Sequence, residues 1–308
     1  MELLESQLMR KYHAVKMDKI VYGWSSDEKY HMTDENGKQY LVRFSKKESL
    51  EAKKKEFRII QKMNTLDVTM SQAVEVGYSE ELDKTYMVFT WVEGEMLSQC
   101  ILNMSEEKQY LLGKEAGEML KKIHEIPVDL IDLPQNSLAD KKMRQLKAYT
   151  ECLSRVEKDE YAISYIMENV DLLKQEKIVY KHGDFHMGNF IFMPNGKIGL
   201  VDFNRLACGE AYEEFQKIQL FEVEVSIPFA IGKLKGYFGG EIPKEFWQLQ
   251  KWYVAHSSLF SIKWAEQFGQ KDVDGMIERY HMAAKDYDDF QLLIPKWYSN
   301  NEKRFLHL

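Results

Sequence analysis

Residues 179–204 read VYKHGDFHMGNFIFMPNGKIGLVDFN, and the clearest structural signal of the chain lies in this stretch. The dipeptide Asn195-Gly196 separates two apolar runs, a pattern that favours a two-residue hairpin turn. In that register Asn189, at the start of one strand, faces Asp202, at the end of the next. The stretch therefore predicts that an amide and a carboxylate from distant positions share one site.

Oxygen donors of these two kinds indicate a magnesium site. An amide oxygen from Asn189 and a carboxylate from Asp202 suit Mg²⁺, which commonly keeps other positions for water and nucleotide phosphates. Asp184 precedes the hairpin on an irregular loop, and we expect it to orient a hydroxyl nucleophile or to accept its proton. His182 is expected to orient this loop through hydrogen bonds to backbone carbonyls or to Asp202.

The motif H-G-D-x-x-x-x-N, followed by a hairpin and V-D-F, resembles the aminoglycoside phosphotransferase family, which is related to the protein kinases. Residues 209–215, GEAYEEF, are similar to the G-D-P-x-E-E-F stretch of that family. The resemblance covers most of the chain and is weakest after about Phe221. It implies a two-lobed, protein-kinase-like α+β fold.

The remaining pattern agrees with two unequal lobes. Residues 19–44 alternate between strand-like runs and turns, with a second hairpin dipeptide at Asn36-Gly37. Residues 46–63 have helical periodicity, and 74–78 and 85–92 are strand-like. Helical patterns follow from Ser105 onward, for example in 246–268 and 276–290. We expect a nucleotide-binding lobe at 1–92, with a small antiparallel sheet and one helix, and a larger, mainly helical lobe at 93–308.

The resemblance also assigns nucleotide contacts in the first lobe. Arg43 matches the basic strand residue that holds the α and β phosphates, where protein kinases have lysine, and Glu56 is its expected helix partner. Glu51 is a weaker candidate for that partner. An exposed arginine at a strand end is the alternative for Arg43 when the motif downstream is disregarded.

Two further segments are expected to contact the nucleotide. The loop 23–29 resembles the nucleotide-covering loop, where Ser25 and Ser26 could donate to phosphates, although a plain surface loop fits its composition equally well. Residues 87–94 resemble the hinge between the lobes, which implies that the Thr90 carbonyl and the Val92 N–H contact a purine base. Core packing would explain the apolar residues there as well.

Acidic residues after the metal aspartate are candidates for the acceptor site. Glu210, Glu213 and Glu214 could bind a cationic acceptor, and 286–289 adds further acidic side chains near the end. Solvated helix faces are the alternative, and Glu213 could instead brace the catalytic loop. Asn204 replaces the glycine of D-F-G and no A-P-E segment follows, so a protein substrate is not expected.

Composition limits the other classes of protein. A formal charge of -7 argues against nucleic-acid binding, and 44% hydrophobic with 30% charged residues is typical of a globular protein. No apolar run predicts a membrane span or signal peptide, so we expect a cytoplasmic protein. We expect it to be a monomer or a dimer. Three widely spaced cysteines predict neither disulfides nor a zinc site.

The motifs predict a phosphotransferase that moves the γ-phosphoryl of Mg-ATP or Mg-GTP to a hydroxyl of a small molecule. The resemblance implies that this molecule is aminoglycoside-like, with antibiotic resistance as one consequence. A macrolide, choline, a sugar or another metabolite is an alternative acceptor. A nucleotide-binding regulator without turnover would share most of the site. A metal-dependent hydrolase could use His182, Asp184, His186 and Asp202, but that reading gives Asn189 no role.

Overall fold

The computed structural model describes residues 8–21, 27–173, 177–305 and 308. It divides into two compact units. The first unit comprises Met1–Met96 with Asn189–Leu206, and the second comprises Leu97–Gly188 with Ala207–Leu308. The first unit thus contains the hairpin around Asn195, which the expected ranges 1–92 and 93–308 assigned to the other lobe.

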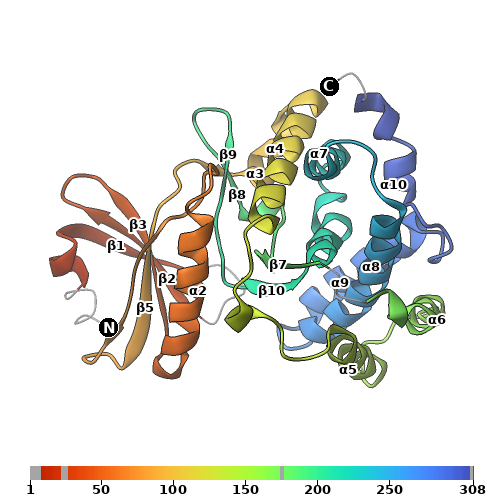
Figure 1. Cartoon of the computed structure of the whole chain (residues 1–308), viewed down its shortest axis with the longest axis horizontal. Coiled ribbons are helices and arrows are strands. Elements are labelled where there is room, and N and C mark those ends of the chain that lie inside the picture. The colour runs from red at the N-terminus through yellow and green to blue at the C-terminus, as the bar shows by residue number, and fades with distance from the viewer. Residues whose placement is uncertain (1–7, 22–26, 174–176, 306–307) are drawn as a thin grey trace. The chain divides into compact units, whose positions relative to one another are not determined.

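An antiparallel sheet forms most of the first unit (Figure 1). Its strand order is β1-β2-β3-β5-β4. The strands are β1 (Ala14–Ile20), β2 (Glu28–Asp34), β3 (Gln39–Lys46), β4 (Ala73–Ser79) and β5 (Lys84–Thr90). The predicted turn between β2 and β3 is present, but its loop has three residues, 35–37, rather than two, because the Asp34 N–H donates to the Lys38 carbonyl. Gly37 has φ +80°, and Asp34 Oδ1 accepts hydrogen bonds from the backbone N–H groups of Asn36 and Lys38.

The two faces of this sheet have different neighbours. One face carries a buried apolar cluster of Leu8, Tyr30, Met32, Tyr40, Val42, Phe44 and Val88. The helix α2 (Leu50–Met63) packs against β4 and β5 and buries Ile59, Ile60 and Met63. Because side chains alternate along a strand, Arg43 lies on the face opposite to Val42 and Phe44. The helix expected after the first strands is therefore present, and residues 8–11 form a further helical segment in the first unit.

The hairpin of the first unit lies in a smaller sheet with the order β6-β8-β9. Its strands are β6 (Glu95–Met96), β8 (Phe190–Phe192) and β9 (Ile198–Leu200). Phe190 pairs with Leu200, and Met193 closes the loop through hydrogen bonds with Gly196 and Lys197. The loop has three residues, with Gly196 at φ +79°, so the predicted two-residue turn was wrong by one position.

The second unit is mainly helical, as predicted (Figure 1). The strands β7 (Ile178–Lys181) and β10 (Ala207–Glu210) form an antiparallel pair within it. Its helices are α3 (Leu97–Cys100), α4 (Glu106–His124), α5 (Leu138–Thr150), α6 (Glu160–Glu168), α7 (Ile227–Phe238), α8 (Lys244–Ala265), α9 (Gln270–Asp286) and α10 (Lys296–Ser299). Among the residues described, none of these helices combines the length and apolar character needed to span a bilayer.

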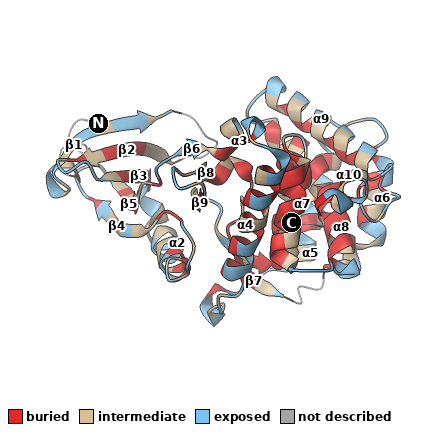
Figure 2. Ribbon diagram, turned by 90° about the horizontal axis from the view of Figure 1, so that it is seen from above, coloured by how far each residue is buried: buried red, intermediate tan, exposed pale blue. Residues whose placement is uncertain are grey.

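Glycines let α4 and α7 approach one another closely. A Cβ added at Gly113 or Gly117 would collide with backbone atoms of α7, and one at Gly232 or Gly236 would collide with backbone atoms of α4. Figure 2 shows α7 and α8 buried along most of their lengths. This close packing fixes Lys233 of α7 inside the unit, where it supports the loop described next.

Candidate active site

The loop between β7 and β8 carries the H-G-D motif. Gly183 has φ +81°, a conformation that favours glycine, and its N–H donates to Glu214 Oε1 at 2.7 Å. His182 is completely buried, and its Nδ1 accepts a hydrogen bond from the Asp184 N–H at 3.3 Å. These contacts hold the backbone on both sides of Gly183, which fits the loop-orienting role predicted for His182.

A buried lysine supports the other side of the loop. Lys233 Nζ donates to the Phe185 carbonyl at 2.8 Å and forms an ion pair with Glu222 at 2.9 Å. Both charged side chains are fully buried. Because an unpaired buried charge is strongly destabilising, this pair fixes the position of the Phe185 carbonyl.

The carboxylate of Asp184 has a lysine and a histidine beside it. Lys217 Nζ lies 2.7 Å and His186 Nε2 lies 3.6 Å from Asp184 Oδ1. Burial alone would raise the pKa of Asp184, but the His186 hydrogen bond and the Lys217 charge outweigh it and lower that pKa. Asp184 is therefore ionised at neutral pH and suited to orienting a hydroxyl group.

Lys217 was not identified from the sequence. It lies two residues beyond the E-E-F motif, and its ammonium also sits over the Phe221 ring, 4.9 Å from the centroid. His186 stacks on the same ring at 5.2 Å. Its position next to a family motif could have marked Lys217 as a candidate site residue. Nothing in the motif indicated that Lys217 pairs with Asp184.

Asn189 and Asp202 lie at the open end of the β8–β9 hairpin in the first unit. The Val201 N–H donates to the Asn189 carbonyl at 3.0 Å, so Asn189 faces Val201 rather than Asp202 as predicted. The extra loop residue causes this shift. Asp202 has φ +67°, so the backbone leaves its extended path at this residue.

The contacts of Asp202 fit a metal ligand. Its Oδ1 is buried and, among the described residues, has no hydrogen-bond partner. Its Oδ2 accepts from Lys29 Nζ at 2.8 Å. A buried oxygen without a donor is costly in the protein alone, and a hard cation would satisfy it. Asp202 and Asn189 thus offer the donor types that Mg²⁺ prefers.

A buried ionic network surrounds Arg43. Its Nη1 lies 2.8 Å from Glu56 Oε1, which confirms the predicted partner, and its Nη2 lies 2.8 Å from Asp27 Oδ2. Lys53 bridges the same two carboxylates at 2.8 Å and 3.1 Å. Burial tends to lower the pKa of Arg43, but Glu56 and Asp27 outweigh it and raise that pKa. Glu51 instead pairs with Lys54 on the exposed side of α2.

Ser25 and Ser26 lie outside the described residues. The neighbouring Asp27 is described, and its Oδ1 accepts from the Ser45 hydroxyl at 2.8 Å. Asp27 therefore attaches the end of the predicted nucleotide-covering loop to β3.

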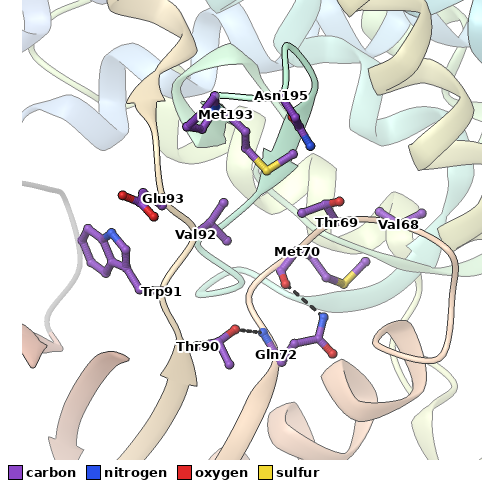
Figure 3. Close-up of a pocket in the computed structure, with 11 residues that line it drawn as sticks. Val68, Thr69, Met70, Gln72, Thr90, Trp91, Val92, Glu93, Met193 and Asn195 are labelled. Carbon is purple, nitrogen blue, oxygen red and sulfur yellow. Dashed lines mark hydrogen bonds between the residues drawn. The ribbon is translucent and has the colours of Figure 1, made fainter. Parts of the chain in front are cut away.

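The predicted hinge lines a cavity of about 620 Å³ within the first unit (Figure 3). Thr90 and Val92 both line it, and the Thr90 hydroxyl accepts from the Gln72 N–H at 2.9 Å. In Figure 3 the Trp91 side chain points away from the other lining residues, and its ring lies 4.2 Å from that of His31. The two hinge residues chosen from the sequence thus border a cavity beside the sheet.

The carboxylates chosen for the acceptor have internal partners instead. Glu213 pairs with Lys142 at 2.6 Å and with Lys181, and these lysines outweigh burial and lower its pKa. Glu210 accepts from the backbone N–H groups of Tyr212 and Glu213. Glu210 and Glu213 thus have partners inside the second unit, and their use in binding a cationic acceptor stays a prediction.

Glu214 supports the catalytic loop directly. Burial raises its pKa to about 7, and its Oε1 binds the Gly183 N–H. The contact with the catalytic loop that was considered for Glu213 is thus made by Glu214. For the hydrolase alternative, no group of three His, Cys, Asp or Glu side chains able to hold a metal ion occurs in the described part of the chain.

Residues 19–246 match the model of a phosphotransferase enzyme family. No curated protein sequence matches the chain. Among solved structures, an amicoumacin kinase in complex with AMP-PNP and Ca²⁺ is similar, with 15% identity, a TM-score of 0.66, and coverage of 94% of this chain and 95% of that chain. A GDP complex of aminoglycoside 2'-phosphotransferase-IIIa has 14% identity, a TM-score of 0.71, and coverage of 92% and 97%. At these identities the likeness establishes the fold, which confirms the predicted α+β, kinase-like architecture.

Proposed function

Because the chain belongs to the phosphotransferase enzyme family, we propose that it transfers the γ-phosphoryl group of Mg-ATP or Mg-GTP to a hydroxyl group of a small molecule. The observation that carries this proposal is the environment of Asp184. An ionised carboxylate on a braced loop, five residues before Asn189 in the chain, suits a reaction that depends on positioning a hydroxyl nucleophile.

Each residue has a separate task in this reaction. Asn189 and Asp202 would hold Mg²⁺, which neutralises charge on the nucleotide phosphates. Asp184 orients the acceptor hydroxyl and receives its proton as the new O–P bond forms and the bond to the leaving nucleoside diphosphate breaks. The lowered pKa makes Asp184 a weak base, so it takes the proton late, when the hydroxyl has become acidic.

The donor is proposed as a purine nucleoside triphosphate. The names of similar solved structures include AMP-PNP, GDP and ADP, and one of those structures also contains Ca²⁺. These ligands support the proposal that the chain uses a nucleotide and a divalent cation, and they do not favour adenine over guanine. ATP and GTP are therefore tested side by side.

The acceptor is proposed as a small hydroxyl compound, with aminoglycosides first in the screen. Hygromycin B is bound in one similar structure, an aminoglycoside phosphotransferase with 14% identity, a TM-score of 0.68, and coverage of 91% of this chain and 97% of that chain. Macrolides, choline and sugars form the other groups of the panel, since the acceptor carboxylates predicted from the sequence have internal partners. Antibiotic resistance would follow only from an antibiotic acceptor.

An acceptor screen tests the proposal. The purified full chain is incubated with Mg-ATP or Mg-GTP and each acceptor, and release of nucleoside diphosphate is measured beside an Asp184→Asn control. We expect one acceptor class to gain a single phosphoryl group by mass spectrometry, with no gain in the control. Nucleotide binding without transfer across the panel would favour the regulator, and nucleotide-independent hydrolysis with retained zinc would favour the hydrolase.

A further inference from the structure

Arg43 is poorly placed to meet a phosphate group, because it is buried between carboxylates. Both of its terminal nitrogens already bind carboxylates, and its side chain is only 3% exposed. Glu56 and Asp27 also place two negative charges beside the guanidinium, and a phosphate would add more. A phosphate at Arg43 would therefore have to enter a buried site that already holds two carboxylates, which is unfavourable.

Lys29 lies directly across from Arg43. The register of β2 and β3 pairs these two residues, and directly paired side chains point to the same face of a sheet. The Lys29 ammonium lies 2.8 Å from Asp202 Oδ2. A cation on the same face as Arg43 thus already contacts the carboxylate proposed to hold the metal ion.

We propose that Lys29, rather than Arg43, is the residue that binds the phosphates of the nucleotide. This inference rests on the proposed function. Without nucleotide, Lys29 neutralises Asp202. With Mg-nucleotide bound, the carboxylate is neutralised by the metal ion, and Lys29 exchanges it for a phosphate oxygen.

The chemistry of the two side chains supports this division of roles. Lysine is a compact charge on a flexible stem with three donors, so it can change partners with small movements. Arginine holds two carboxylates at once through its planar fork. Arg43 then joins β3, Asp27 and α2 into a rigid support, while Lys29 supplies the movable charge.

Calorimetry of nucleotide binding tests the proposal without relying on turnover. The full chain and Lys29→Met are titrated with adenosine, ADP and ATP in the presence of Mg²⁺, and with the guanine series in parallel. We expect Lys29→Met to lose about 10-fold or more in affinity for the diphosphate and triphosphate, a typical effect of removing a charge-assisted contact, and to bind the nucleoside normally. Lys29→Arg should recover part of the loss.

Lys84→Met is the matched control, since Lys84 is a strand lysine paired with Glu28 at 2.5 Å. It should bind all ligands like the parent chain. Equal affinities of Lys29→Met and the parent for ATP would overturn the role of Lys29, as would an equal loss for adenosine, because that would indicate general damage. A parent chain that binds none of these ligands would instead overturn the proposed function together with this inference.

Discussion

Lys217 Nζ and Asp184 Oδ1 lie 2.7 Å apart, although the two residues belong to different segments of the chain. Lys217 follows the helical turn that contains Glu213 and Glu214, and Asp184 follows the Gly183 amide that Glu214 binds. The Glu214 side chain therefore holds the backbone of the catalytic loop, and Lys217 places a positive charge beside Asp184.

Replacing Lys217 with methionine should shift the pH dependence of transfer. Lys217 and His186 together outweigh burial and keep the pKa of Asp184 low. Without Lys217 the pKa rises, so the carboxylate becomes protonated at higher pH and the acidic limb of kcat/KM moves toward neutrality. Measuring kcat/KM against pH tests this, and Lys217→Arg should keep the parental profile. Identical profiles for parent and Lys217→Met would contradict the electrostatic role.

Asp184→Asn should separate transfer from binding. Loss of the carboxylate removes orientation and proton acceptance, so kcat should fall by roughly 10²–10⁴-fold. Nucleotide affinity should stay near the parental value, because the residues proposed to bind nucleotide lie elsewhere in the sequence. Turnover and calorimetry on the same preparations provide the test, and a fully active variant would remove Asp184 from the role proposed here.

Asp202→Ala should show the opposite pattern in binding. The variant loses the buried oxygen that a cation would satisfy, so Mg-ATP affinity should fall by at least about 10-fold. Binding of adenosine, which carries no phosphate, should be unchanged. Titrations with and without Mg²⁺ measure the effect, and the same Mg²⁺ dependence in the variant and the parent would argue against metal binding at this residue.

Glu213→Gln should destabilise the second unit. Glu213 neutralises Lys142 and Lys181, both nearly buried, and removing one partner of a buried ion pair costs about 3–5 kcal/mol. Thermal and denaturant unfolding measure the loss. The exposed Glu245→Gln is the control and should unfold like the parent; a similar result for Glu213→Gln would show that the pairing contributes little.

Glu214→Gln should flatten the pH dependence of stability. Burial raises the pKa of Glu214 from 4.5 to about 7, so between these values the folded chain binds a proton that the unfolded chain releases. The free energy of unfolding therefore falls as pH rises through this window, on the order of 3 kcal/mol from this residue. Denaturant unfolding at several pH values should show a smaller decline in the variant, which keeps a carbonyl oxygen for Gly183.

Local sequence patterns predicted many of the elements and their order. The hairpin dipeptides, the periodicity of residues 46–63 and the helical patterns after Ser105 all depend on short-range geometry, and each predicted an element found in the structure. The family resemblance predicted the Arg43–Glu56 ion pair, because it implies a basic residue on a strand and a carboxylate partner on the next helix.

Register and long-range pairing depended on the folded chain. The hairpin around Asn195 contains one more loop residue than its dipeptide indicated, because the left-handed Gly196 can close a three-residue loop as well as a two-residue one. Lys29 meets Asp202 across 173 positions, and Lys217 meets Asp184 from a different element. The sequence around a lysine does not indicate which carboxylate it will pair with. That partner depends on how distant segments pack together and exclude water around the pair.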